Sequence, residues 1–171
     1  ILLHALSAFR PNSLAADYDA DYAAQAVQRF LARVPRGKER YWDGVRETVA
    51  ELYAAAREQS GARLFLDKTP RYYLVLPELM RLFPAARIVV LLRHPLAVLA
   101  SVHAAWGVPQ VSHLCRYRHD LLQAPRLLLD AVRSPTSTVS VVRYEELVAS
   151  PSEVLAALCK RLGVQFDPGM L

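Results

Sequence analysis

One run of residues restricts what this chain can fold into more than any other. From Val89 to Ser101 it reads VVLLRHPLAVLAS, and it continues an apolar run that begins at Ile88 and ends directly before Arg93. A short apolar run of this kind is typical of a strand that is buried on both faces of a parallel sheet. Pro95 suits the first turn of a helix, and the apolar residues after it recur at helical spacing. The run therefore predicts a buried strand, a tight turn and a helix.

Further strands and helices alternate along the chain. Hydrophobic patterning predicts three strands, near residues 64–67, 86–92 and 138–143. Helices are expected at 17–34, at 39–59, at 77–83, from 95 onward, at 112–133 with a bend at Pro125, and from a capping box at 150–153 to Gly163. Strands that are separated by helices favour a parallel sheet with crossover connections. We therefore expect an α/β fold.

Composition places the chain among globular proteins. Its 171 residues suit one domain, and a hydrophobic content of 53% excludes a disordered chain. No apolar run reaches the roughly 18 residues of a membrane helix, because Arg93 and His94 interrupt the longest candidate. The chain starts abruptly with apolar residues and without Met, so we expect it to be an internal part of a longer protein.

Charge and cysteine usage bear on the partners and the compartment. The net charge is +5, but Lys and Arg are scattered and no basic run exceeds two residues. Binding of nucleic acid calls for a basic stripe with interleaved aromatic residues, so we expect no nucleic-acid partner. Cys115 and Cys159 lie in helical patterns without metal-ligand spacing. Buried reduced thiols are expected, and these suit a cytoplasmic protein.

The residues at the ends of the three predicted strands share a chemical character. Lys68 follows the first strand, Arg93 follows the second, and Arg143 ends the third. In an open parallel sheet, ligands bind beyond the carboxyl ends of the strands, where helix N-termini also offer unpaired N–H groups. Each strand is thus expected to bring a cation to one common edge. Such an edge is typical of a site for an anion with several charges.

Ser101 adds a possible second donor to this edge. It lies nearly two helical turns beyond Pro95, so its hydroxyl can turn toward the same edge as Arg93. A guanidinium fork matches a phosphate, and a serine hydroxyl adds another hydrogen bond. Taken alone, these residues leave two interpretations open. One is an anion site, and in the other Arg93 is solvated or paired with a carboxylate while Ser101 is structural.

Three motifs in a fixed order resemble those of the sulfotransferase superfamily. Arg93, the proline turn and Ser101 eight positions on look like the family's 3′-phosphate-binding segment. The segment LFLDKTPRYYLVLPELMRLFPAARIVVLLRHPLAVLASV resembles the bacterial branch over its whole length. The later segment VVRYEELVASPSEVLAALCKRLGV is similar to the family's last strand and helix. The resemblance extends from about Leu64 to Leu171.

The resemblance implies a fold, an activity and site residues. The fold is a P-loop NTPase-like three-layer arrangement, with a parallel sheet flanked by helices. The activity is transfer of a sulfuryl group from 3′-phosphoadenosine 5′-phosphosulfate (PAPS) to a hydroxyl or amine, which leaves adenosine 3′,5′-bisphosphate (PAP) and uses no metal. By the same resemblance, Arg93 and Ser101 bind the 3′-phosphate, Tyr144 contacts the adenine, and Lys68 stabilises charge near the reacting sulfate. The acceptor is not identified by these motifs.

The sequence also departs from the family pattern. Family members hold the 5′-phosphosulfate in a P-loop-like segment after a first strand, and neither is found here. We therefore expect residues 1–171 to be a single sulfotransferase-like domain, truncated at both ends and inactive alone. Cytosolic relatives carry a catalytic histidine where this chain has Pro70. The candidates for the general base are then Asp67, His94, His103 and, on the pattern of the relatives, an acidic residue outside the chain.

Two other classes of protein fit the same residues. A P-loop-type kinase or nucleotide-binding domain shares the sheet architecture, although the eight-residue spacing from Arg93 to Ser101 argues against it. The second is a nucleotide-binding module without catalysis. A Walker lysine and a magnesium-binding acid upstream of Ile1 would favour the kinase, and a parent sequence without any phosphate loop would favour the module.

Overall fold

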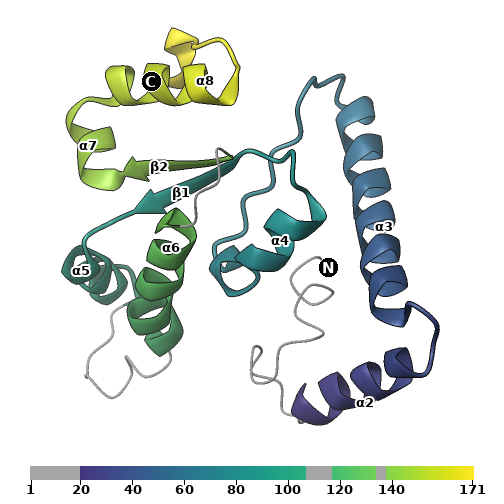
Figure 1. The fold of residues 1–171 in the computed structure, drawn as a ribbon. Coiled ribbons are helices and arrows are strands. Elements are labelled where there is room, and N and C mark those ends of the chain that lie inside the picture. The colour runs from purple at the N-terminus through teal and green to yellow at the C-terminus, as the bar shows by residue number, and fades with distance from the viewer. Residues whose placement is uncertain (1–19, 107–116, 134–137) are drawn as a thin grey trace. The chain divides into compact units, whose positions relative to one another are not determined.

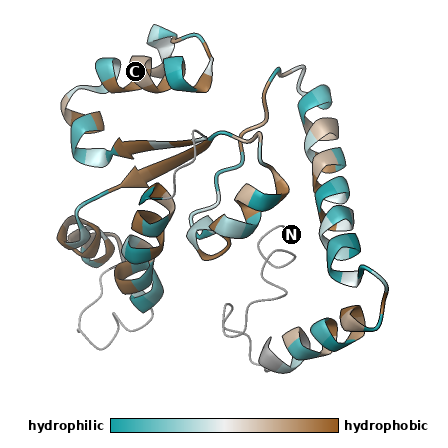
Figure 2. Ribbon diagram, viewed as in Figure 1, coloured by the Kyte–Doolittle hydropathy of each residue, from teal (hydrophilic) through white to brown (hydrophobic). Residues whose placement is uncertain are grey.

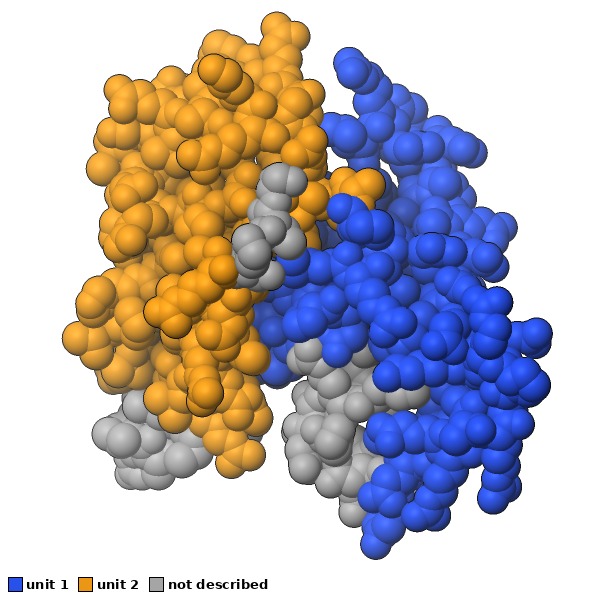
Figure 3. Space-filling model, viewed as in Figure 1, with its two compact units in different colours: residues 1–84 blue, residues 85–171 orange. Residues whose placement is uncertain are grey.

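The computed structural model describes residues 20–106, 117–133 and 138–171. The chain divides into two compact units, residues 1–84 and 85–171, which Figure 3 colours blue and orange. The starts of two predicted helices, at 17–19 and 112–116, lie outside the described residues, as does Cys115. Within the described ranges, no helix combines the length and the apolar character that a membrane crossing requires.

The first unit is built from helices. Helices α2 (Ala20–Ala32) and α3 (Gly37–Gln59) are followed by the 3-10 helix η1 (Tyr72–Leu74) and by α4 (Leu76–Leu82) (Figure 1). The predicted helices at 17–34, 39–59 and 77–83 are thereby confirmed, with small shifts at their ends. The chain reverses at Arg36, whose φ of 53° is left-handed. Gly37 is required after it, because a Cβ would lie 2.2 Å from the carbonyl oxygen of Leu31.

A small hydrophobic core holds the first unit together. Helix α3 contributes Trp42 and Val49, which pack with Val75 and Leu82. Full burial of an apolar side chain of this size stabilises the folded state by roughly 1.5–3 kcal/mol. Half-buried side chains surround the core, namely Tyr41, Val45, Tyr53, Tyr72, Leu74, Leu79 and Phe83. Trp42 and Val49 recur at helical spacing along α3 and form its buried face, whereas Leu52 is exposed.

The predicted strand at 64–67 is wrong. This segment forms no β-ladder with the described residues, and Leu64, Phe65 and Leu66 are exposed, Leu66 to 87%. A short apolar run has strand propensity, but a strand forms only where another strand satisfies its backbone N–H and C=O groups. The segment is attached instead through Phe65, whose ring stacks on that of Tyr53 at a centroid distance of 4.2 Å.

The second unit contains the sheet. Strand β1 (Ile88–Leu92) pairs in parallel with β2 (Val139–Arg143), so that Leu92 lies opposite Arg143. The two predicted strands at 86–92 and 138–143 are confirmed, and they lie side by side. Between them the structure has helix α5 (Pro95–Trp106), the π-helical turn η3 (His119–Gln123) and helix α6 (Ala124–Arg133); after them come α7 (Tyr144–Ala149), α8 (Pro151–Leu162) and the 3-10 helix η4 (Pro168–Met170).

Helices cover the two strands unequally. Helix α6 contacts both strands, whereas α7 and α8 contact β2. Figure 1 shows α6 on one side of the strand pair and α8 on the other, and Figure 2 shows that both strands are hydrophobic. Val90 and Val142 are buried, but Val89 and Leu91, which share one face of β1, are 41% and 51% exposed. The prediction that β1 is buried on both faces is therefore wrong, because the described helices leave this face of β1 uncovered.

Proline and glycine mark the helix boundaries in the second unit. Pro125, where a bend is predicted, is the second residue of α6 and follows the π-helical turn η3, after which the N–H of Ala124 donates to the carbonyl of His119, five residues back. Pro125 has no N–H with which to continue the normal helical pattern. The predicted capping box is only partly correct, since Pro151 begins α8 but the Ser150 side chain makes no capping hydrogen bond. Gly163 ends α8 at a left-handed φ of 70°, as predicted.

Candidate functional site

Two of the predicted site residues meet at the carboxyl end of the sheet. Arg93 directly follows β1, and Tyr144 directly follows β2. Because the strands are parallel and Leu92 lies opposite Arg143, the next residue of each strand also falls beside its counterpart. The guanidinium carbon of Arg93 lies 4.3 Å from the centroid of the Tyr144 ring, which is a cation–π distance. The strand register therefore produces this contact.

The guanidinium of Arg93 is half-buried and has an unused donor. Its Nε is shielded from solvent and finds no hydrogen-bond acceptor in the described parts of the chain. Buried donors without a partner are rare and cost roughly 1–3 kcal/mol. Among the described carboxylates, none forms an ion pair with Arg93. The planar guanidinium matches a phosphate or sulfate in geometry, so the group fits an anion with several acceptor oxygens.

The residue after Arg93 fixes the start of α5. The carbonyl oxygen of His94 accepts a hydrogen bond from the N–H of Ala97 at 2.9 Å. Its ring Nδ1 accepts another from the N–H of Leu96 at 3.2 Å. His94 is therefore the N-cap residue of α5, and Pro95 occupies the first helical position as predicted. The positive end of the α5 dipole thus begins next to Arg93 in the chain.

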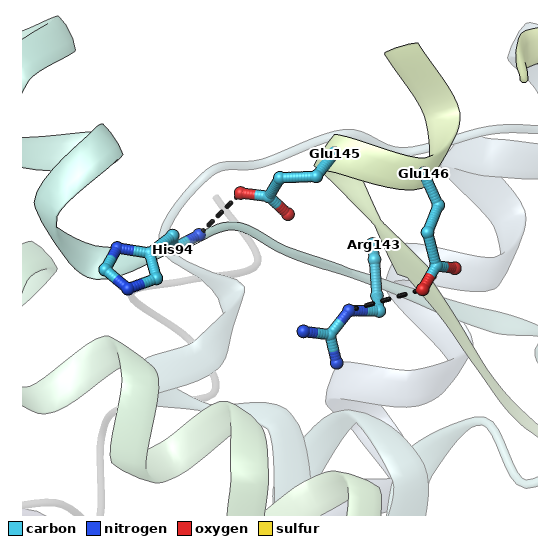
Figure 4. A network of polar contacts seen from close by, with 4 residues as sticks. All are labelled: His94, Arg143, Glu145 and Glu146. Atoms are coloured by element: carbon cyan, nitrogen blue, oxygen red, sulfur yellow. Dashed lines mark hydrogen bonds and ion pairs between the residues drawn. The ribbon is translucent and has the colours of Figure 1, made fainter. Parts of the chain in front are cut away.

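A carboxylate links the turns after the two strands. Oε1 of Glu145 accepts a hydrogen bond from the backbone N–H of His94 at 2.9 Å (Figure 4). This hydrogen bond is the main cause that lowers the pKa of Glu145 below its ordinary value, and the charges of Arg143 and Arg93 act in the same direction. Glu145 is therefore ionised at neutral pH, and it ties the first turn of α7 to the turn after β1.

The edge of the sheet carries acidic as well as basic side chains. Nε of Arg143 lies 3.4 Å from Oε1 of Glu146, and both side chains are exposed (Figure 4). An exposed ion pair of this kind contributes little to stability. With Glu145 nearby, the described edge is less basic than its strand-end cations predict. Of the two arginines at this edge in the described structure, Arg93 is the one without a carboxylate partner.

The remaining predicted site residues are exposed. Ser101 lies on α5 and makes no hydrogen bond to Arg93 in the described structure. Lys68 is exposed in the first unit, whereas Arg93, Ser101 and Tyr144 belong to the second. His103, a candidate base, is exposed in the last turn of α5. No three His, Cys, Asp or Glu side chains are grouped as metal ligands within the residues that the structure describes.

Asp67, another candidate base, is surrounded by hydroxyl groups. The hydroxyls of Tyr53 and Tyr72 both donate to its Oδ2, and the hydroxyl of Thr69 donates to its Oδ1 at 3.1 Å. Partial burial opposes the ionisation of Asp67, but these hydrogen bonds outweigh it and lower the pKa of Asp67. Burial, followed by the hydrogen bond to Asp67, raises the pKa of both tyrosines. A carboxylate that is stabilised in this way is a weak base.

Sequence patterning did not predict helix α7 or the partners of Asp67. Tyr144 is the first residue of α7 rather than a strand residue, and Glu145 lies in its first turn. The two glutamates after Tyr144 offer a signal for this helix, because acidic residues favour a helix N-terminus. Tyr53 and Tyr72 stand 14 and 5 residues from Asp67, and these separations follow no local pattern.

A family model identifies the class of this protein, and two known proteins are similar to the chain. Residues 4–168 match the model of the sulfotransferase family, and the chain belongs to that family. The nodulation protein NoeE of Sinorhizobium fredii (strain NBRC 101917 / NGR234) is 32% identical over 166 residues, which cover 84% of this chain and 37% of that protein. The sulfotransferase domain from the curacin biosynthetic pathway is similar in structure, with a TM-score of 0.58 and 22% identity over 86% of this chain and 56% of that chain.

These comparisons confirm the predicted family and the mixed α/β fold with a small parallel sheet. The match to the solved domain, at 22% identity, concerns the fold alone. The chain spans little more than a third of the length of NoeE and about half of the solved domain.

Proposed function

We propose that this chain provides the 3′-phosphate- and adenine-binding part of a PAPS-dependent sulfotransferase. Residues 1–171 then belong to one P-loop NTPase-like three-layer domain, whose reaction transfers a sulfuryl group to a hydroxyl or amine. The observation that carries the proposal is the half-buried Arg93 at the end of β1, whose guanidinium has no carboxylate partner among the described residues. Membership of the sulfotransferase family supports the choice of donor. The buried free thiol of Cys159 favours a cytoplasmic location.

Arg93 is proposed to bind the 3′-phosphate of the nucleotide. Because its Nε is shielded, the outer nitrogens Nη1 and Nη2 form the fork that meets the phosphate oxygens. The Tyr144 ring, 4.3 Å away, supports the guanidinium and also contacts the adenine edge in this proposal. Ser101 is proposed as a second donor, from the helix whose N-terminus lies next to Arg93 in the chain.

Sulfuryl transfer makes physical demands similar to those of phosphoryl transfer. The acceptor oxygen or nitrogen attacks the sulfur, the bond from sulfur to the 5′-phosphate oxygen breaks, and the acceptor gives its proton to a base. Positioning and stabilisation of charge supply most of the rate. Lys68 is proposed to stabilise the charge that develops between the sulfate and the leaving phosphate. Its exposure leaves its ammonium group accessible to a nucleotide.

The general base is proposed to be neither Asp67 nor His94. The oxygens of Asp67 already accept three hydroxyl groups, and Nδ1 of His94 accepts the N–H of Leu96. Two candidates then remain from the sequence: His103, and an acidic residue outside the chain.

A comparison of nucleotides tests the proposed function. We expect the complete purified protein to bind PAPS and PAP more tightly than ATP in calorimetric titrations, with or without Mg²⁺. A P-loop kinase would bind ATP with Mg²⁺ more tightly, and that result would overturn the proposal. Release of PAP that depends on an added hydroxyl or amine acceptor would then separate an enzyme from a non-catalytic module.

A further inference from the structure

The hydroxyl groups around Asp67 form a cluster that spans three parts of the first unit. Tyr53 comes from α3, Tyr72 comes from η1, and Asp67 and Thr69 come from the segment between these helices. Both tyrosines are half-buried, and Asp67 is exposed. Below, this cluster of Tyr53, Asp67, Thr69 and Tyr72 is called the hydroxyl cluster. Asp67 accepts three hydroxyl donors in this cluster, and the proposed sulfuryl-transfer mechanism assigns it no role.

Two residues of the hydroxyl cluster are the neighbours of Lys68 in the sequence. Asp67 precedes Lys68 and Thr69 follows it, and the Thr69 hydroxyl donates to Oδ1 of Asp67 at 3.1 Å. The carbonyl oxygen of Thr69 also accepts the backbone N–H of Tyr72 at 3.2 Å. The chain is therefore held on both sides of Lys68. The Lys68 side chain itself is exposed and has no hydrogen bond or ion pair within the described residues.

We propose that Asp67 is a positioning residue, which the hydroxyls of Tyr53 and Tyr72 hold so that the backbone at Lys68 is fixed for binding the sulfate group of PAPS. This inference rests on the function proposed above. A lysine has several free torsions, and each one that is restrained before binding reduces the entropy lost on binding. A fixed backbone leaves only the side-chain torsions to be ordered. The hydroxyl cluster therefore acts through Lys68 and does not touch the nucleotide.

The geometry separates this role from that of a general base. Oδ2 of Asp67 accepts both phenol hydroxyls, and Oδ1 accepts Thr69, so little acceptor capacity is left for a substrate proton. The lowered pKa of Asp67 agrees with this reading, because a stabilised carboxylate has little tendency to take up a proton. The tyrosine hydroxyls serve as donors that keep the carboxylate in place.

A ratio of affinities tests the inference without an acceptor. PAPS carries the sulfate and PAP does not, so the ratio of their dissociation constants, measured by calorimetry on the complete protein, reports the sulfate contact. Lys68→Met should reduce the preference for PAPS about tenfold or more, as the loss of one charge-assisted hydrogen bond does. The double variant Tyr53→Phe/Tyr72→Phe should reduce it less, and it should leave PAP affinity unchanged.

The double-mutant comparison decides between positioning and a merely structural role. Once Lys68→Met is present, the two tyrosine changes should have no further effect on the ratio. Asp67→Asn keeps one carbonyl acceptor and should retain more of the preference than Asp67→Leu does. Tyr22→Phe, at an exposed tyrosine on α2, is the matched control and should change nothing. Thermal unfolding of each variant reports on folding separately.

Each other outcome has a defined meaning. If the tyrosine changes weaken PAPS and PAP equally, or if they still act after Lys68→Met, the hydroxyl cluster does not work through Lys68 and the inference is overturned. If Lys68→Met leaves the ratio unchanged, Lys68 does not bind the sulfate, and the inference is overturned with it. Failure of the unaltered protein to bind either nucleotide would refute the proposed function itself.

Discussion

The guanidinium of Arg93, at the end of β1, packs against an aromatic ring. Its guanidinium carbon lies 4.3 Å from the centroid of the Tyr144 ring. A guanidinium is weakly hydrated and packs well on aromatic faces, whereas a lysine ammonium is strongly hydrated and cannot offer two parallel donors. The arrangement thus favours arginine over lysine at this position, both for the contact with the ring and for an anion in front of it.

The contact between Arg93 and Tyr144 predicts how two substitutions differ. Tyr144→Leu should weaken PAP binding by about 0.5–2 kcal/mol, because the guanidinium loses the ring that supports it. Tyr144→Phe keeps the ring and should retain most of the affinity. Calorimetric titration measures the PAP affinity of both variants. Tyr22→Leu, at an exposed position on α2, serves as the control. An equal loss in the Phe and Leu variants would show that the hydroxyl matters and the ring does not.

At the scale of elements, a hydrogen bond connects the turns that follow the two strands. The N–H of His94, at the start of α5, donates to the carboxylate of Glu145, in the first turn of α7. Through this bond each turn limits the movement of the other, and Arg93 and Tyr144 lie directly before these two residues in the chain. The relative positions of Arg93 and Tyr144 are therefore expected to depend on Glu145.

Glu145→Gln should lower the free energy of unfolding near neutral pH but not in acid. The pKa of Glu145 in the folded protein lies below its ordinary value of 4.5, so the ionised carboxylate stabilises the fold above that pH. This stabilisation is lost as the pH falls through the folded pKa. Urea unfolding at about pH 7 and at about pH 3 measures the difference between the variant and the unaltered protein.

The matched control for this pH prediction is Glu146→Gln. Glu146 is the next residue of α7, and its exposed pair with Arg143 contributes little. We expect this variant to stay close to the unaltered protein at both pH values. A deficit in Glu145→Gln that persists unchanged in acid would contradict the assigned role of the carboxylate.

Two exposed glycines in helical context should respond to alanine in opposite directions. Gly163 ends α8 with a φ of 70°. Gly163→Ala should therefore lower the free energy of unfolding by about 1–2 kcal/mol, because a residue with a Cβ is strained in the left-handed conformation. Gly44 lies inside α3 with open space around it, so Gly44→Ala should stabilise by about 0.5–1 kcal/mol. Thermal unfolding checks both. Destabilisation at both positions would mean that the backbone conformation does not decide the effect.

The elements that the sequence predicts correctly have local causes. Apolar runs with β-branched residues predict β1 and β2, and Pro95 predicts the start of α5. The strand at 64–67 fails because pairing depends on a partner that lies far away in the sequence. The side-chain cap at Ser150 fails for a related reason, since a motif shows which hydrogen bond is possible and not which one forms.

In the candidate site, too, the sequence predicts the features with local causes and misses the long-range contacts. Arg93 and Tyr144 each follow a strand, so their meeting follows from parallel pairing and register alone. The link from Glu145 to His94 spans 51 residues, and no spacing rule indicates it. The strand-end cations alone predict an edge that is more positive than the observed one, because Glu145 and Glu146 also lie there.

At the scale of the whole molecule, family membership identifies the class of protein, and local structure identifies the groups that could bind a ligand. The family model matches almost the entire chain, residues 4–168, and this defines the class of protein. The structure adds a specific arrangement of groups in each unit: the hydroxyl cluster in the first, and the Arg93–Tyr144 contact in the second. The second arrangement carries the proposed choice of a nucleotide with a 3′-phosphate.

The most direct test of that choice compares two nucleotides that differ in one phosphate. Calorimetry should show that the complete protein prefers PAP strongly over AMP. Arg93→Ala should cost about 2–5 kcal/mol with PAP and almost nothing with AMP, because in the proposed function this change removes the charged partner of the 3′-phosphate. Arg93→Lys should recover only part of this, and Arg143→Ala, at the exposed arginine that ends β2, should leave the preference in place. If Arg93→Ala weakens PAP and AMP equally, Arg93 is a structural residue and does not bind the 3′-phosphate.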